Sequence, residues 1–129
     1  MDESYKPQGY NSASPYLMVD GADRTIDFLT RVFGATELRR FSHPDGKVMH
    51  AEVRIDDTVV MLTDGAPPDY PATASHVHVY VSNVDDTYRR ALGTGATSVQ
   101  EPIQKGDDDK RGGFTDAGGT TWWIATKVQ

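Results

Sequence analysis

Residues 16–36, YLMVDGADRTIDFLTRVFGAT, contain the signals for a strand, a helix and a helix end. The apolar run that reaches back to Ala13 is extended in character, and Asp20-Gly21 ends it. Apolar residues then recur at helical spacing, at Ala22, Ile26, Leu29 and Phe33. Gly34 marks the end of the predicted helix. We therefore expect a strand followed by an amphipathic helix.

Three more strands are predicted after this helix. Thr36–Phe41 resumes strand-like residues, and the turn signal His43–Gly46 follows. Alternation then places Met49, Ala51, Val53 and Ile55 on one face and His50, Glu52 and Arg54 on the other. Asp56-Asp57 turns the chain into the last strand, Thr58–Thr63. The predicted order is therefore βαβββ.

The same pattern restarts after a proline-rich linker, residues 65–74. The strand at Tyr16 returns at His78, 78 − 16 = 62 residues later, and the glycine stop at Gly34 returns at Gly95, 95 − 34 = 61 residues later. This register predicts an internal duplication within one domain, residues 1–129, with modules at about 12–64 and 75–127. A single ferredoxin-like α+β domain, with a different order of strands and helices, is the alternative.

The composition argues against several classes of function. Nineteen acidic against thirteen basic side chains give a net charge of −6, which disfavours nucleic acid as a partner. The absence of cysteine excludes disulfides, thiolate zinc sites and cysteine nucleophiles, and it fits a reducing compartment. The polar N-terminus lacks a secretory signal, and no apolar stretch approaches the roughly 20 residues that span a bilayer. We expect a cytoplasmic protein without a membrane partner.

Six short motifs occur in an order and spacing that match a known family: Ser14–Asp20, Phe33-Gly34-Ala35, Met49–Glu52, Gly95-Ala96-Thr97, Lys110–Gly113 and Asp116–Thr126. They resemble the PhnB-like branch of the glyoxalase, bleomycin-resistance and extradiol-dioxygenase superfamily, also called the vicinal oxygen chelate (VOC) superfamily. The resemblance covers nearly the whole chain beyond the first dozen residues. It implies an α+β fold in which two tandem βαβββ modules form curved mixed sheets around a cavity. It also implies a homodimer, because members generally cover their exposed strand edges by pairing.

In the enzymes of this family, four strand positions facing the cavity bind a divalent metal through His, Glu or Gln side chains. The resemblance places these positions at Ser14, Met61, His76 and Trp123. Only His76 suits such a metal, because serine is a poor ligand, methionine prefers soft ions and tryptophan offers only an N–H donor. We therefore predict that the inherited metal site is lost and that the protein uses no cofactor.

Strand alternation predicts the cavity face without reference to the family. A uniformly apolar set is expected to face the helices: Leu17, Val19, Val60, Leu62, Val77, Val79, Val81, Trp122 and Ile124. The opposite face supplies the predicted ligand-binding set: Tyr16, Met18, His50, Glu52, Arg54, Met61, His76, His78, Tyr80 and Trp123. This mixture of aromatic, polar and sulfur-containing side chains is typical of a small-molecule pocket. The same aromatic residues could instead complete a dimer interface or a filled core.

Two classes of function remain open. The first is a metal-free binding protein, similar to bleomycin-resistance proteins, that sequesters an aromatic or cationic small molecule by stacking and cation–π contacts. The second is a metal-dependent lyase, isomerase or dioxygenase whose displaced site combines His50 and Glu52 with His76 or His78. We expect the binding protein, and we assign no catalytic residue to it. The run Asp107–Asp109 is expected to be a solvated loop.

Overall fold

The computed structural model describes residues 5–66 and 68–128, which contain eight strands and two helices. The first half holds β1 (Tyr16–Val19), α1 (Ala22–Phe33), β2 (Thr36–Ser42), β3 (Val48–Ile55) and β4 (Thr58–Asp64). The second half holds β5 (Ser75–Tyr80), α2 (Val84–Gly93), β6 (Thr97–Gln104), β7 (Asp109–Thr115) and β8 (Thr120–Lys127). The predicted βαβββ order therefore occurs twice.

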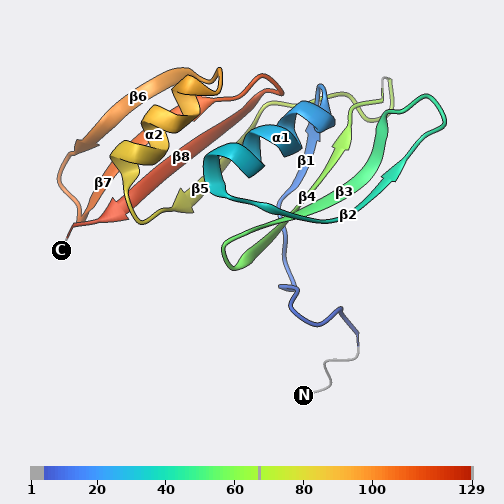
Figure 1. Cartoon of the computed structure of the whole chain (residues 1–129), viewed down its shortest axis with the longest axis horizontal. Helices are drawn as coiled ribbons and strands as arrows, with labels where there is room; N and C mark the ends of the chain where they lie inside the picture. Colours follow the sequence, from blue (N-terminus) through green and yellow to red (C-terminus); the bar gives the residue numbers. More distant parts are fainter. Residues whose placement is uncertain (1–4, 67, 129) are drawn as a thin grey trace.

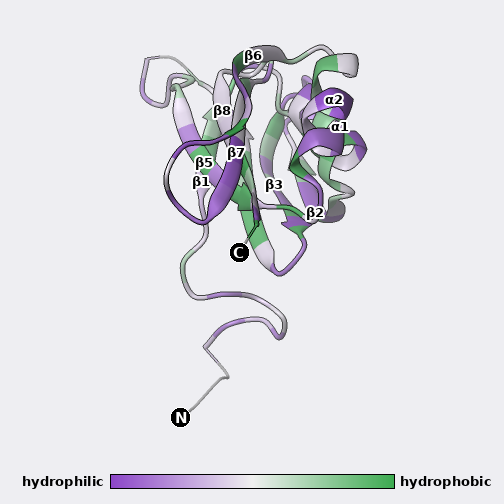
Figure 2. Cartoon of the chain, turned by 90° about the vertical axis from the view of Figure 1, so that its left-hand side faces the viewer, coloured by the Kyte–Doolittle hydropathy of each residue, from purple (hydrophilic) through white to green (hydrophobic). Residues whose placement is uncertain are grey.

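The strands form two four-stranded mixed sheets with the same topology. The orders are β1-β4-β3-β2 and β5-β8-β7-β6. The first strand of each module runs parallel to the last, and the other pairs are antiparallel. Figure 1 shows the sheets side by side with both helices in front of them, and Figure 2 shows the helices together on one side. The α+β fold of two modules is thus confirmed, the sheets of the described chain do not close into a barrel, and the ferredoxin-like alternative is excluded.

The ends of α1 are fixed by groups that the sequence places there. Gly34 follows the helix with φ 67°, a left-handed conformation that costs glycine little, and its N–H donates to the carbonyl of Thr30. At the other end, Asp64 Oδ1 accepts the N–H groups of Gly21 and Ala22 at 3.1 and 2.8 Å. The carboxylate at the end of β4 therefore caps the start of α1.

The core lies between the helices and the inner faces of both sheets. Leu17, Leu62, Trp122 and Ile124 are buried there, as the alternation predicts. Phe28 and Phe33 of α1 reach the second sheet, where the ring of Phe28 lies 5.9 Å from Phe114 and that of Phe33 lies 5.5 Å from Trp122. The two modules consequently share one core. Neither α1 nor α2 is long and apolar enough to cross a membrane.

The sequence analysis placed Met49 on the same strand face as Ala51, Val53 and Ile55, and this prediction is wrong. Met49 is exposed, and its neighbour Val48 is buried in the core instead. The cause is an irregularity in the pairing of β2 with β3, where Phe41 pairs with His50 but Ser42 pairs with Val48. Such a bulge adds one residue to a strand, so the side-chain alternation shifts at that point. From His50 onward the predicted faces hold.

Candidate functional site

The predicted ligand-binding residues lie on the two sheet faces that point away from the helices. We call the first the N-face, with Tyr16, Met18, His50, Glu52, Arg54 and Met61, and the second the C-face, with His76, His78, Tyr80 and Trp123. Strand pairing places Tyr16, Met61 and Glu52 in one row across the first sheet, and it places His78 beside Trp123 in the second. Within one chain, the predicted ligand-binding residues are therefore divided between two faces.

Glu52 is the centre of the N-face. Its side chain is only 1% exposed, and it accepts three hydrogen bonds: Tyr10 Oη donates at 2.5 Å, Arg39 Nε at 2.9 Å and His50 Nε2 at 2.8 Å. Burial alone would raise the pKa of Glu52, but the hydrogen bonds from Arg39, Tyr10 and His50 outweigh it and lower the pKa to about 2. Glu52 is therefore an ionised carboxylate near neutral pH, with three hydrogen-bond donors around it.

His50 connects Glu52 to the exposed part of the N-face. Its Nδ1 lies 3.0 Å from the hydroxyl of Tyr16, so both ring nitrogens have partners. The ring of Phe41 stacks on His50 with centroids 6.5 Å apart, and the guanidinium of Arg39 lies over Phe41 at 5.8 Å. Tyr16 and Phe41 remain about half exposed, at 48% and 51%. The N-face thus presents aromatic rings over a buried polar network.

The segment before β1 also contacts the N-face. Besides the Tyr10 hydroxyl on Glu52, the carbonyl of Gly9 accepts from Arg54 Nη2 at 3.1 Å, and the side chain of Asn11 accepts from the N–H of Val59 at 3.0 Å. The alternation analysis missed Tyr10 and Arg39. The one available signal was chemical, because a buried glutamate on a strand requires donors from other parts of the chain.

The C-face carries a second polar network, centred on Arg111 of β7. Arg111 donates to His78 Nε2 at 3.1 Å and to Asp109 Oδ2 at 2.8 Å, and Tyr80 donates to the same carboxylate oxygen at 2.7 Å. Burial and the neighbouring Arg111 charge lower the pKa of His78, which favours its neutral form. The Asp107–Asp109 run is therefore more than a solvated loop, since Asp109 begins β7 and joins this network.

Trp123 forms the aromatic part of the C-face. Its indole N–H donates to His76 Nδ1 at 3.1 Å, and the two rings are stacked with centroids 6.3 Å apart. Gly113 lies directly beneath the indole, because a Cβ added there would approach the Trp123 ring to 2.7 Å. A glycine at this position thus lets the indole lie flat against β7.

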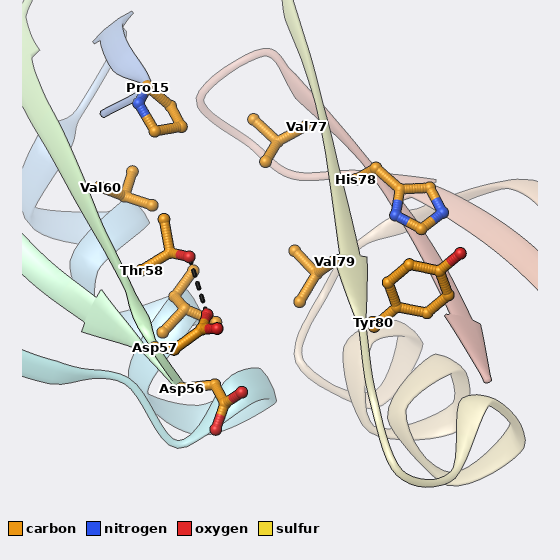
Figure 3. A pocket seen from close by; sticks show the side chains of 10 residues that line it. Pro15, Asp56, Asp57, Thr58, Val60, Val77, His78, Val79 and Tyr80 are labelled. Carbon is orange, nitrogen blue, oxygen red and sulfur yellow. Dashed lines mark hydrogen bonds between the residues drawn. The ribbon is translucent and has the colours of Figure 1, made fainter. Parts of the chain in front are cut away.

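A cleft of about 280 Å³ separates the two modules along β5. Figure 3 shows Val77 and Val79 pointing from β5 toward Val60 on β4. His78 and Tyr80 lie on the other side of β5 in this view. The cleft therefore has mixed walls, because Asp56, Asp57 and Thr58 line it together with the valines. Of the predicted ligand-binding residues, only His78 and Tyr80 border it.

Comparison with known proteins agrees with this architecture. The family model described as the Glyoxalase/Bleomycin resistance protein/Dioxygenase superfamily matches residues 11–124. The chain belongs to this superfamily. An uncharacterised protein of Mycobacterium bovis is 36% identical over 126 residues, which cover 90% of this chain and 83% of the relative.

Solved structures of the superfamily fold have different functions. TioX from Micromonospora sp. ML1 has a TM-score of 0.71 at 26% identity and covers 90% of this chain and 99% of its own. TnmS3, an antibiotic binding protein from Streptomyces sp. CB03234, has a TM-score of 0.70 at 18% identity, with 91% and 97% covered. FosX, a fosfomycin resistance protein from Listeria monocytogenes complexed with Mn(II), has a TM-score of 0.70 at 17% identity, with 91% and 90% covered. These likenesses show the fold and leave the activity open.

The residues that the resemblance places at the superfamily's metal positions do not suit a divalent metal. Ser14 and Met61 belong to the first module, and His76 and Trp123 belong to the C-face. The indole N–H of Trp123 is a donor and already holds His76 Nδ1. Within residues 5–66 and 68–128, no group of three or more His, Asp or Glu side chains is placed to hold a metal ion. The displaced set of the alternative hypothesis is split between the two faces in one chain.

Proposed function

We propose that the chain is a metal-free small-molecule binding protein whose ligand lies between an N-face and a C-face. The observation that carries this proposal is the contrast between the two sides of each sheet. The helix side is buried and apolar, whereas the opposite side presents Tyr16 and Tyr80 with 48% and 62% of their surface exposed. Exposed aromatic residues among convergent polar groups are typical of a recognition surface.

A second copy of the chain is proposed to close the site. The charges of the two faces are complementary. Arg39 and Arg54 outnumber Glu52 on the N-face, and the three carboxylates of the Asp107–Asp109 run outnumber Arg111 and Lys127 beside the C-face. The N-face of one copy against the C-face of another would pair opposite surpluses and cover the exposed rings. A two-fold arrangement would make both sites at once.

The ligand class follows from the side chains. Stacking on Tyr16, Phe41, Tyr80 or Trp123 contributes about 0.5–1.5 kcal/mol per aromatic pair, and a cation over a ring contributes about 0.5–2 kcal/mol. Several such contacts together with apolar burial reach the roughly −8 kcal/mol of micromolar affinity. We therefore propose an aromatic or cationic ligand. We also propose that the protein acts in the cytoplasm, since a chain without cysteine forms no disulfide and suits a reducing compartment.

Fluorine NMR tests this function through the two tryptophans. Protein labelled with 5-fluorotryptophan gives one signal from Trp122 and one from Trp123, and a Trp123→Phe variant assigns them. Aromatic and cationic fragments are expected to shift the Trp123 signal and leave the buried Trp122 signal in place. A library in which no fragment moves Trp123, or in which both signals move together, contradicts the proposed binding surface.

A metal-dependent enzyme is the second candidate, and the donor types on the two faces favour it. The proposed dimer would bring His50 and Glu52 of one copy toward His76 or His78 of the other, which are the donor types that bind zinc or iron. Against it, Glu52 already accepts three hydrogen bonds and both nitrogens of His50 are engaged. Elemental analysis after purification without chelator separates the two, since about one metal per chain would favour the enzyme.

A further inference from the structure

Three polar groups form one continuous chain across the N-face. The Glu52 carboxylate lies 2.8 Å from His50 Nε2, and His50 Nδ1 lies 3.0 Å from the Tyr16 hydroxyl. Glu52 is buried at the inner end of this chain, and Tyr16 is half exposed at the outer end. The direction of the hydrogen bond between Tyr16 and His50 therefore depends on the ionisation state of Glu52.

The ionised carboxylate of Glu52 fixes the tautomer of His50. An ionised carboxylate only accepts hydrogen bonds, so His50 Nε2 must carry the hydrogen and donate it. The opposite tautomer would place the Nε2 lone pair 2.8 Å from a carboxylate oxygen, and both atoms would be acceptors. In the neutral ring, Nδ1 then carries the lone pair.

The fixed tautomer of His50 determines whether the Tyr16 hydroxyl donates or accepts a hydrogen bond with a ligand. His50 Nδ1 accepts the hydroxyl hydrogen of Tyr16, so the phenol oxygen retains only lone pairs for any other partner. Hydrogen bonds in a chain polarise one another, and the anion at the end makes this oxygen a stronger acceptor. Two cations lie on the same face. Arg39 is on β2, at the opposite edge of the sheet from β1, and Arg54 is on β3, where its Nη2 donates to the carbonyl of Gly9.

We propose that Tyr16 is a specificity-determining residue that selects ligands bearing an N–H cation, such as a primary ammonium, over ligands without a hydrogen-bond donor. This inference rests on the proposed function, because it assumes that the ligand lies on the N-face. The ammonium group donates to the Tyr16 oxygen while the attached aromatic body stacks on the exposed rings. The overall charge of −6 attracts a cation at long range. Because Arg39 and Arg54 give the N-face itself a positive surplus, the nearby negative charge comes from the Asp107–Asp109 run of the C-face that opposes it in the proposed dimer.

The arrangement of the chain can be tested without a ligand. Nitrogen NMR of protein labelled with ¹⁵N-histidine is expected to show His50 as the Nε2–H tautomer when the ring is neutral. A Glu52→Gln variant, whose amide can both donate and accept, is expected to lose this preference. An Nδ1–H tautomer in the parent protein overturns the proposed polarity of Tyr16.

The selectivity is tested with two probes, 2-naphthylmethylammonium and its N,N,N-trimethyl analogue, which share ring and charge and differ only in N–H groups. The parent is expected to bind the ammonium about tenfold more tightly, because a hydrogen bond to a charged group contributes at least that factor. Tyr16→Phe is expected to bind both probes equally. The matched control Tyr88→Phe, which removes a hydroxyl bonded to Ser98 away from both faces, keeps the tenfold preference.

Each outcome decides a different point. Equal binding of the two probes by the parent, or a preference that survives in Tyr16→Phe, overturns the role of Tyr16. Failure of both probes to bind also overturns it. In that case the proposed function is tested separately. It is supported if uncharged or anionic aromatic fragments shift the fluorine signal of Trp123, and it is contradicted if they do not.

Discussion

Trp122 donates its indole N–H to Asp116 Oδ2 at 2.8 Å, and both residues are buried on the helix side of the second sheet. The next residue, Trp123, donates to His76 on the opposite side. Adjacent residues of one strand therefore belong to different environments, the shared core and the C-face. This relationship ties the fold to the proposed site, because a register shift of one residue would exchange the two roles.

Alanine substitutions of the two tryptophans are predicted to have different effects, mainly on stability for Trp122 and mainly on ligand binding for Trp123. Trp122→Ala removes a fully buried indole and leaves Asp116 without one donor, so it is expected to cost about 3–5 kcal/mol of unfolding free energy. Trp123→Ala is expected to cost less and to weaken ligand binding by about 1 kcal/mol or more. Urea denaturation and ligand titration measure both. A Trp123→Ala variant that unfolds while Trp122→Ala melts like the parent would show that the assigned faces are reversed.

The ionised state of Glu52 predicts a specific loss of stability in acid. Its pKa is about 2 in the folded chain against an ordinary value of 4.5. For a lowered pKa, the stabilisation is complete above the unfolded value and is lost as the pH falls through the folded value. The full difference corresponds to about 3 kcal/mol, most of which should disappear between about pH 4.5 and pH 2.

The Glu52→Gln variant isolates this effect from the other carboxylates. The stability advantage of the parent over Glu52→Gln, measured by urea unfolding, is expected to shrink by about 2 kcal/mol between pH 6 and pH 2.5. An advantage that is constant across this range would mean that Glu52 is not held as a paired anion.

Gly113 is predicted to set the position of Trp123. A methyl group at Gly113 meets the rigid indole at 2.7 Å, so Gly113→Ala is expected to displace the ring, shift the Trp123 fluorine signal and weaken ligand binding. Gly93→Ala is the control, since an added Cβ there has no neighbour within 4 Å. If Gly113→Ala leaves the Trp123 signal unchanged, the indole does not lie flat on β7.

The N-face is predicted to form part of the dimer contact. Phe41→Ser removes an exposed ring that stacks on His50, and it is expected to weaken self-association measured by sedimentation. Tyr70→Ser removes a ring of the linker that is also more than half exposed, and it is expected to leave association unchanged. Equal effects of the two substitutions would exclude the N-face as the contact surface.

The sequence predicts the faces of this fold better than the contacts on them. Period-two alternation correctly assigned Leu17, Leu62 and Trp122 to the core, because a strand side chain has only two sides to occupy. It failed at Met49, because the bulge depends on the pairing with β2 and leaves no mark in the spacing.

The periodicity of the sequence could not predict the polar networks. Tyr10 lies 42 positions from Glu52, and Arg111 lies 33 positions from His78, so each partner is defined only once the chain has folded. The packing of Phe28 on Phe114 across the two modules is of the same kind. Alternation finds which side chains share a face, whereas long-range pairing decides which of them meet.

Native mass spectrometry of protein purified without chelator tests the central claim most directly. The account predicts a dimer of twice 14.2 kDa, about 28 kDa, that carries no divalent metal and takes up an aromatic cation such as 2-naphthylmethylammonium. The Trp123→Ala variant should form the same dimer with less bound cation. A monomer of 14.2 kDa, or a chain with one tightly bound metal ion, would contradict the account.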